Sequence, residues 1–405
     1  MLTWQHVTED TKRFVTQNRV FLLLVSGAFF ARLWFVPSWY SPIEIRNWGK
    51  TGYAIATGHL VDFYHLVPQY RYPPIWGYLL GLAYRLDAFV DTSGRISPFD
   101  ATFLLFAKLP IILADLVAGI IIYKLIKNTT NNRKQALFVS GLYLFNPWLV
   151  FVSGKWGHFD GICAFFLITA VYLLAQKRRE ASAIATGLAM STKQFAYPFG
   201  LVLSLLLWRK QSWRQGAIFF VISYGVLTLF SMPFLIFDRE AYLDALIYAL
   251  PEDASLRTRA GIWAVFNALE RFIPGTAISS PLPFYIFYGI LLAIIISFTL
   301  FKLDIAPPTI NDVALTLSLM FLTFSPQIHT NYFVLCIPFI CTGIGINHHK
   351  IWYAITFLPF LGTWVYTASP LEDPTRIIWL LIVTAIFVGT LLGMIAAFLS
   401  ATRHR

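Results

Sequence analysis

The feature that most restricts the fold of this chain is a series of long apolar stretches. A membrane-spanning helix needs roughly 17–25 mostly apolar residues, and stretches near this length lie at 20–36, 101–126, 135–152, 161–176, 215–237, 283–302, 309–325, 331–347, 351–367 and 376–399. Charged residues make up 13% of the 405-residue chain, whereas soluble proteins carry about 25%. The sequence therefore predicts an all-α polytopic membrane protein. It excludes a soluble nucleic-acid-binding protein, a disulfide scaffold and a disordered chain.

The basic residues predict how these helices cross the membrane. The net charge is +11, and Lys and Arg gather in the cytoplasmic loops of membrane proteins. Basic clusters lie before the first apolar stretch, at 124–134, 177–179 and 209–214, and at the end of the chain. All of them are cytoplasmic if 73–90 lies on the outer surface as an amphipathic helix and 181–208 enters the membrane and returns. Both termini are then cytoplasmic.

The segment 181–208 is expected to form a short hairpin. Its halves, at 181–192 and 195–208, would each span about 18–21 Å as helices, which is less than a hydrocarbon core of ~30 Å. Lys193 and Gln194 lie at the tip of this hairpin. With the longer stretches, it gives about twelve membrane helices, two of them short.

We expect one membrane domain over residues 1–405. Its N-terminal part, 1–237, would include the first outer loop at 37–100, and 238–405 would be more variable helices with further outer loops. The predicted topology places the unusual polar residues on the outer face. A functional site is therefore expected on that face.

Two segments of the first outer loop carry candidate site residues. Glu44 follows the first membrane helix, and a partly desolvated carboxylate there could act as a general base. The alternative is a first-turn glutamate favoured by the helix dipole. Arg71 and Tyr72 precede a rigid Pro-Pro bend. Either both residues anchor the loop at the membrane interface, or Arg71 is directed at a phosphate group.

Charged residues at other outer positions and at membrane depth give further candidates. His158 and Asp160 lie two residues apart in an outer turn and could share a site. A metal is not favoured, because no third ligand is nearby, and the turn is expected either to bind substrate or to be structural. Lys193 is a cation at membrane depth, which by default indicates a functional site. Its expected partner is an anion such as a lipid phosphate, and the alternative is a structural pair with an internal carboxylate. Asp115, in an apolar helix, is expected to be structural.

Late outer loops supply further donors for an anion. The segment Arg-Thr-Arg-Ala-Gly-Ile-Trp-Ala-Val-Phe-Asn holds Arg257, Arg259, Trp263 and Asn267, and a second outer turn holds His329. Taken alone, each of these residues is only weak evidence for an anion-binding site. Their common property is that the predicted topology places them on the face that carries the tip of the hairpin.

Together these motifs resemble those of the integral-membrane glycosyltransferases of the GT-C superfamily. Two branches are similar: the dolichyl-phosphate-glucose glucosyltransferases of asparagine-linked glycan assembly, and prokaryotic proteins related to the second mannosyltransferase of GPI-anchor synthesis. The resemblance covers most of the chain and rests on the acidic first loop near Glu44, Tyr72-Pro73-Pro74, Ala114-Asp115-Leu116, Gly157-His158-Phe159-Asp160, Lys193-Gln194, Trp263 with Asn267, and the turn with His329.

The chain departs from the family pattern at two places. Glu44 is the acid nearest to the position of the family's first-loop aspartate, and no Asp-x-Asp is present. Thr330 and Asn331 follow His329, where the family has acidic and basic neighbours. The identity of the catalytic base is therefore less determined by the resemblance than the fold is.

The resemblance implies an inverting transfer of a hexose, with mannose preferred over glucose, from a polyprenyl- or dolichyl-phosphate donor to a hydroxyl of a glycan, glycolipid or protein. The transfer would occur at the extracytoplasmic or lumenal face of a prokaryotic plasma membrane or the endoplasmic reticulum, without a cofactor. Glu44 would be the base, with Asp160 as second candidate. The departing phosphate would be held by Lys193, His329, Arg257 and Arg259, and Arg71 and His158 would orient the substrates. The alternative from another class is a lipid-linked-sugar flippase or a transporter.

Overall fold

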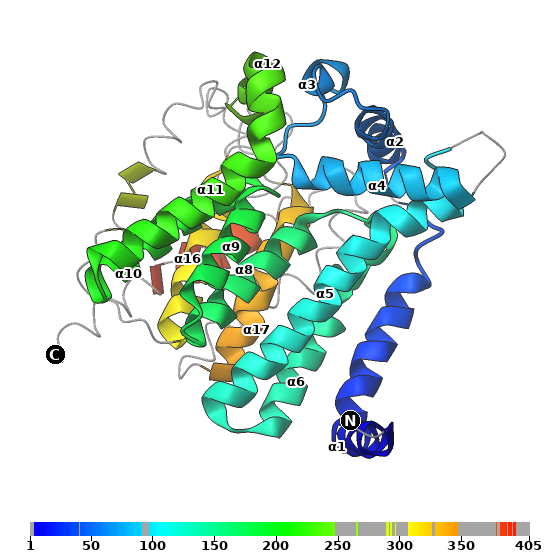
Figure 1. Ribbon diagram of the computed structural model, residues 1–405. Helices are drawn as coiled ribbons and strands as arrows, with labels where there is room; N and C mark the ends of the chain where they lie inside the picture. The colour runs from blue at the N-terminus through cyan, green and yellow to red at the C-terminus, as the bar shows by residue number, and fades with distance from the viewer. Residues whose placement is uncertain are drawn as a thin grey trace.

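The computed structural model (Figure 1) describes residues 4–39, 41–90, 97–247, 307–325 and 329–346, with isolated helical residues at 265, 289–290, 292–293, 296, 378, 381–386, 388–390 and 392–393. Within these residues all regular structure is helical. The elements are α1 (Trp4–Leu33), α2 (Pro42–Ala56), α3 (Phe63–Leu66), α4 (Ile75–Val90), α5 (Ala101–Thr130), α6 (Arg133–Leu144), α7 (Pro147–Val150), the π-helix η1 (Phe151–Trp156), α8 (Asp160–Ala175), α9 (Arg179–Met190), the 3-10 helix η2 (Gln194–Ala196), α10 (Tyr197–Lys210), α11 (Trp213–Phe237), α12 (Arg239–Ile247), α16 (Pro307–Phe324), the 3-10 helix η3 (Thr330–Leu335) and α17 (Ile337–Ile346).

The all-α membrane architecture predicted from the apolar stretches is confirmed. In the part of the chain that the structure describes, α5 and α11 are long and apolar enough to cross a bilayer, and α6 with the segment Pro147–Trp156 gives a third span if this bent pair crosses as one. The apolar stretches at 283–302, 351–367 and 376–399 lie largely outside the described residues. The total of about twelve helices and the division of the chain near residue 237 therefore stay predictions.

One predicted helix is broken in the structure. The stretch 135–152 is expected to form a single helix, but α6 ends at Leu144 and the chain turns by 45° into Pro147–Trp156. Asn146 caps the second piece, because its Oδ1 accepts hydrogen bonds from the backbone of Trp148 and Leu149 at 2.9 and 3.1 Å. Proline has no N–H and suits the first position of a new helix. The apolar pattern alone does not reveal such a break.

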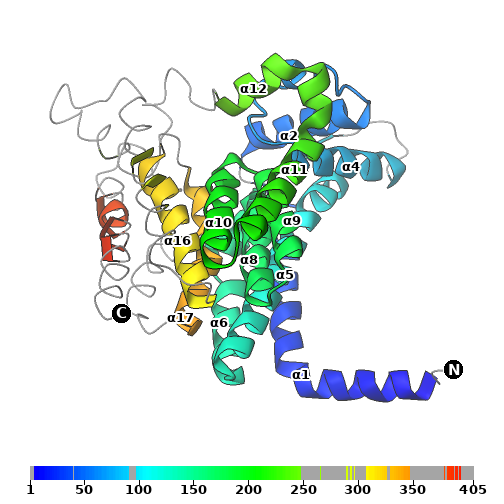
Figure 2. The ribbon, with the colours of Figure 1, turned by 60° about the vertical axis from the view of Figure 1, so that its left-hand side comes forward.

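The described residues of 37–100, the segment expected to be the first outer loop, form helices at one end of the bundle. Figures 1 and 2 show α2, α3, α4 and α12 gathered there, whereas the loop that joins α5 to α6 lies at the opposite end. Helix α4 confirms the helix expected over 73–90. It packs closely on α2, since a Cβ at Gly81 would lie 2.4 Å from the Ile55 side chain. The end of the bundle that carries the basic α5–α6 loop is thus separated from the end that carries the first outer loop.

The hairpin expected over 181–208 is present as α9 and α10, with Lys193 in the turn between them. The side chain of Lys193 is buried. Two apolar cores lie next to the turn that carries Lys193. The larger core is mainly aliphatic and includes residues of α5, α6, α8, α16 and α17. The smaller core is rich in aromatic residues and includes residues of α2, α3 and α4. Trp156 belongs to the first core and Phe159 to the second. The short segment between η1 and α8 therefore lies where the two cores meet.

Candidate active site

A buried ion pair forms the centre of the site. Asp160, the first residue of α8, is fully buried, and its carboxylate pairs with the ammonium of Lys193. His158 Nδ1 lies 2.9 Å from Asp160 Oδ2. The side-chain amide nitrogen of Asn331, in η3, donates to Asp160 Oδ2 and lies 3.2 Å from the His158 ring nitrogens. Three segments that are far apart in the sequence thus meet at one carboxylate.

A glycine in a left-handed conformation allows the chain to place His158 and Asp160. Gly157 has a φ of +77°, which L-residues with a side chain rarely adopt. A Cβ at this position would lie 2.9 Å from Lys108 and from Trp48. Because Gly157 ends the π-helix and lets the chain reverse, the next residues point into the interior. π-Helical turns frequently occur at functional sites.

The turn that carries Lys193 is fastened to the first outer loop. The backbone N–H of Ile75 donates to the carbonyl of Ser191 at 3.1 Å, and Gln194 Nε2 donates to the carbonyl of Arg71 at 2.6 Å. Gln194, expected to bind substrate, thus uses its amide nitrogen to hold this loop. The Tyr-Pro-Pro segment and the tip of the hairpin are consequently one structural unit.

Aromatic rings enclose the ammonium of Lys193. Its Nζ lies 3.5 Å from the centroid of the Tyr332 ring, and 5.3 Å from those of Tyr72 and Phe159. A cation over ring faces is stabilised by the negative potential of those faces. Lys193 is therefore held by one carboxylate and three rings, in surroundings that keep a charged group at this depth.

The phenol of Tyr72 stays protonated at neutral pH. Burial raises the pKa of Tyr72 above its ordinary value, and the negative charge of Asp160 raises this pKa further. The ring of Tyr72 also packs edge-on against Phe159, with centroids 4.9 Å apart. Tyr72 thus offers the site both a ring face and a hydroxyl.

Glu44 reaches the same site from α2. Its backbone N–H donates to Oγ of Ser41, which caps the helix, and its half-buried carboxylate accepts a hydrogen bond from the indole Nε1 of Trp156. The indole ring in turn lies 5.8 Å from the His158 ring, edge to face. Glu44 and Asp160 are therefore linked through two ring side chains, and the structure brings together both acids expected at the site.

The remaining predicted site residues fall into two groups. His329 packs edge-on against Tyr332, the ring that lies next to the Lys193 ammonium, and the two ring centroids are 5.9 Å apart. Arg71 is half-buried and lies next to Tyr72. The other predicted residues lie outside the described part of the chain: Arg257, Arg259, Trp263 and Asn267.

The sequence pointed to neither Trp156, Tyr332 nor Asn331 as a site residue. Each lies inside a segment that does contain a predicted residue, Trp156 beside His158 and the other two just after His329. Proximity to a motif was thus the one available signal. Asn331 stands where the resemblance leads one to expect a charged residue, and in the structure it makes contacts with Asp160 and His158.

A second buried ion pair lies nearby. Arg32 Nε of α1 lies 3.3 Å from Asp115 Oδ2 of α5, and both side chains are inaccessible to solvent. Arg32 also donates to Ser153 Oγ and to the carbonyls of Ala28 and Leu144, at 2.8 to 3.1 Å. These contacts join α1, α5, α6 and η1, as the structural role expected for Asp115 requires. Arg32 was not identified from the sequence.

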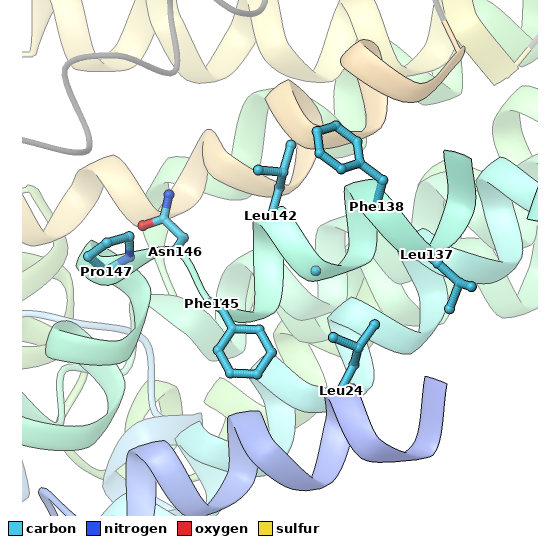
Figure 3. Close-up of a pocket in the computed structure, with 8 residues that line it drawn as sticks. Leu24, Leu137, Phe138, Leu142, Phe145, Asn146 and Pro147 are labelled. Atoms are coloured by element: carbon cyan, nitrogen blue, oxygen red, sulfur yellow. The ribbon is translucent and has the colours of Figure 1, made fainter. Parts of the chain in front are cut away.

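Among the described residues, no group of three or more His, Cys, Asp or Glu side chains could hold a metal, and the expectation that the site needs no cofactor stays a prediction. A separate groove of about 490 Å³ lies between α1 and α6 (Figure 3) and shares no residue with the site. Its lining is apolar except for the side chain of Asn146. The lining residues are Leu24, Leu137, Phe138, Gly141, Leu142, Phe145, Asn146 and Pro147.

Part of the candidate site lies in a segment that matches the model of a known protein family. Residues 71–237 match the family model of dolichyl-phosphate-mannose-protein mannosyltransferase. This segment includes the turn with His158 and Asp160 and the hairpin with Lys193. GPI mannosyltransferase 1 of Kluyveromyces lactis is 27% identical over 169 residues, which cover 41% of this chain and 37% of the relative. The chain thus matches well under half of the length of this curated relative.

Two solved structures of the Archaeoglobus fulgidus oligosaccharyltransferase also align with the chain. One is tethered to an acceptor peptide, with a TM-score of 0.45 and 9% identity over 95% of this chain and 56% of that one. The other is the apo form, with a TM-score of 0.44 and 10% identity over 93% and 55%. Similarity at this level supports no conclusion by itself. The resemblance to the GT-C superfamily is confirmed by the family model and the yeast relative, which come from branches other than the two suggested by the motifs.

Proposed function

We propose that this chain is an inverting glycosyltransferase that moves a hexose from a polyprenyl- or dolichyl-phosphate donor to an acceptor hydroxyl. The observation that carries the proposal is the buried Asp160–Lys193 pair, with Glu44 linked to it through Trp156 and His158. A glycosyl transfer to a hydroxyl needs a base for the acceptor and a cation for the departing phosphate. Both kinds of group converge here, within or beside the segment that matches the mannosyltransferase family.

Lys193 is the group that would receive the charge of the leaving phosphate. When the sugar leaves, the phosphodiester becomes a phosphomonoester and gains one negative charge. An ammonium already fixed by a carboxylate and three rings requires little reorganisation as that charge develops, which is the condition for effective electrostatic stabilisation. His329, one ring away, is placed to assist, and Arg257 and Arg259 are further candidates.

Glu44 is favoured over Asp160 as the base. Asp160 is fully buried and engaged by Lys193, His158 and Asn331, and a carboxylate so occupied has little capacity to accept another proton. Glu44 is half-buried and accepts its hydrogen bond from a neutral indole. It would take the proton of the acceptor hydroxyl as the oxygen bonds to the anomeric carbon and the bond from that carbon to the phosphate oxygen breaks. Asp160 then serves to hold Lys193 in place.

Mannose is the preferred sugar, because both the family model and the yeast relative carry mannosyltransferase in their names. The acceptor is proposed as a hydroxyl on a glycan, glycolipid or protein at the extracytoplasmic or lumenal face. The positive-inside rule supports this face, since the basic α5–α6 loop lies at the end of the bundle opposite α2 and α4 (Figure 2). This agrees with the orientation proposed from the sequence, in which both termini are cytoplasmic.

Transfer of radiolabelled mannose tests the proposal. The purified protein in lipid nanodiscs is given polyprenyl-phosphate mannose, with polyprenyl-phosphate glucose as the alternative donor, and a panel of glycoside acceptors. We expect a labelled product and released polyprenyl phosphate with the wild type. Glu44→Gln should reduce the rate by roughly 10²- to 10⁴-fold, as for loss of a general base, while donor binding is retained.

Glu180→Gln is the matched control, because Glu180 is an exposed glutamate in the first turn of α9. It should transfer at the wild-type rate. Full activity in Glu44→Gln would remove Glu44 from the role of base. Movement of the labelled lipid across proteoliposomes, with no covalent product for any acceptor, would instead support a flippase.

A further inference from the structure

Lys108 of α5 is a buried lysine that interacts with backbone carbonyls instead of a carboxylate. Its side chain is inaccessible to solvent, and Nζ donates to the carbonyl oxygens of Val36, Ser38, Gly154 and Lys155 at 2.5 to 3.1 Å. Within the described residues no Asp or Glu lies at ion-pair distance from it. Because a buried cation is costly, these carbonyl dipoles must offset the loss of hydration.

The four carbonyls belong to two segments that both lead into the candidate site. Val36 and Ser38 follow the end of α1, shortly before Ser41 caps the helix that carries Glu44. Gly154 and Lys155 are in the last turn of η1, immediately before Trp156. One ammonium therefore joins the segment before Glu44 to the segment before His158 and Asp160.

The packing around the lysine stem extends this connection to the turn itself. The position of a Cβ on Gly157 would be 2.9 Å from Lys108 Cγ and Cε, so the stem lies directly against the backbone of the residue that precedes His158. At Gly154, a Cβ would be 3.0 Å from the carbonyl oxygen of Arg32. The end of α1 and the π-helix are thus in close contact as well as bridged by the ammonium.

We propose that Lys108 is a positioning residue that sets the distance between the two acids of the site. It acts on Glu44 through residues 36–39, which precede the helix of Glu44, and through Trp156, whose indole donates to that carboxylate. It acts on Asp160 through Gly157 and His158. Lys108 itself touches neither acid. The catalytic part of this proposal rests on the proposed transferase function, and the structural part does not.

Hydrogen–deuterium exchange tests the structural part. The amides of Gly157 and His158 donate to the carbonyl of Val152, and the amide of Ile45 donates to that of Ser41. In Lys108→Met we expect exchange to rise in peptides that cover 36–45 and 152–160, and to stay unchanged in the rest of α5. Lys124→Met is the control, since Lys124 is an exposed lysine on the same helix, and it should exchange as the wild type does.

Lys108→Arg keeps the positive charge but presents a planar fork of donors. Its exchange should rise less than that of Lys108→Met in the same two segments. If Lys108→Met does not fold, a local rise in exchange in Lys108→Arg supports the proposal in its place. Equal exchange in wild type and variant, or a rise spread over the whole chain, overturns the proposal. The exchange measurement does not depend on enzyme activity. If no preparation transfers a sugar, the proposed transferase function is wrong, and the exchange data still show whether Lys108 positions the two segments.

Steady-state kinetics test the catalytic part. A small displacement of reacting groups lowers the rate by about 10²-fold, so kcat of Lys108→Met should fall by about this factor. KM for the lipid donor should change less than kcat, because a loss of positioning acts mainly on the reacting groups. Partial recovery of kcat in Lys108→Arg is expected. An unchanged kcat in a Lys108→Met protein that does show the local rise in exchange would overturn the catalytic role.

Discussion

Two buried ion pairs in the part of the chain that the structure describes, Arg32–Asp115 and Lys193–Asp160, are both hidden from solvent but have different surroundings. Arg32 directs its donors at two backbone carbonyls, a serine and its partner carboxylate. Lys193 faces three aromatic rings, and its partner Asp160 also contacts His158 and Asn331. The first pair joins helices, whereas the second collects side chains that can exchange protons or face a ligand.

This comparison shows that the burial of a charge does not by itself identify a functional site. An intramembrane charge is a functional candidate by default, and that criterion applies equally to Arg32 and Lys193. What distinguishes them is the chemistry of the neighbours. Fixed backbone oxygens can only satisfy a donor, while rings, an imidazole and a second acid nearby can bind and transform a substrate.

Removing one member of the Arg32–Asp115 pair should have the largest effect. Asp115→Ala leaves a buried guanidinium without its carboxylate, and the loss of stability is expected to be about 3–5 kcal/mol. The double variant Arg32→Met with Asp115→Asn removes both charges and should recover most of this loss. Thermal unfolding in detergent measures the three proteins. Equal destabilisation in the single and double variants would mean that the charges themselves are needed.

Removing both charges of the second pair should affect catalysis more than stability. Lys193→Met with Asp160→Asn is expected to unfold near the wild-type temperature and to lose about 10²- to 10³-fold in kcat, as when one electrostatic donor is deleted. The Arg32→Met and Asp115→Asn double variant, assayed in parallel, should keep kcat near the wild-type value. If both doubles lose activity to the same extent, the distinction between a structural and a functional pair is wrong.

The smallest effect concerns the ring of Tyr72. Tyr72→Leu removes one of three faces from Lys193, which should cost about 0.5–2 kcal/mol, or roughly 2- to 30-fold in kcat/KM. Tyr72→Phe keeps the face and should lose less. Because burial and the charge of Asp160 raise the pKa of the phenol above its ordinary value, the phenol stays protonated up to about pH 10. The two profiles of rate against pH, for wild type and Tyr72→Phe, should therefore have the same shape below that pH.

Several parts of the site could be predicted because each is a property of a short segment. His158 and Asp160 are two residues apart, and Lys193 is a cation in apolar sequence, so both were identified from local pattern. Arg32 meets the same criterion as Lys193, but it lies within an otherwise apolar stretch whose average hydrophobicity predicts only a membrane helix. Trp156 and Tyr332 gave no signal beyond their proximity to a predicted residue, because aromatic residues are common at the ends of membrane helices for other reasons.

The break at Asn146 and the partner of Asp160 illustrate what local pattern does not contain. Hydrophobic periodicity averages over a window and is insensitive to a single side-chain cap. The choice of Lys193 as the partner of Asp160, and of Arg32 as the partner of Asp115, depends on which helices become neighbours. No spacing along the chain encodes these contacts, which join residues 33 and 83 positions apart.

The sequence by itself determined that this is an all-helical membrane protein, and it correctly predicted a helix over 73–90 and a pair of short helices over 181–208. That the unusual polar residues lie on an outer face stays a prediction. Those properties follow from the free energy of transferring each segment between water and lipid, which is nearly additive along the chain. Only the tertiary structure decided which carboxylate pairs with which cation, and that Lys108 binds carbonyls instead of an acid. A buried charge is stabilised by whatever dipoles packing brings within a few ångströms, and packing is a property of the whole fold.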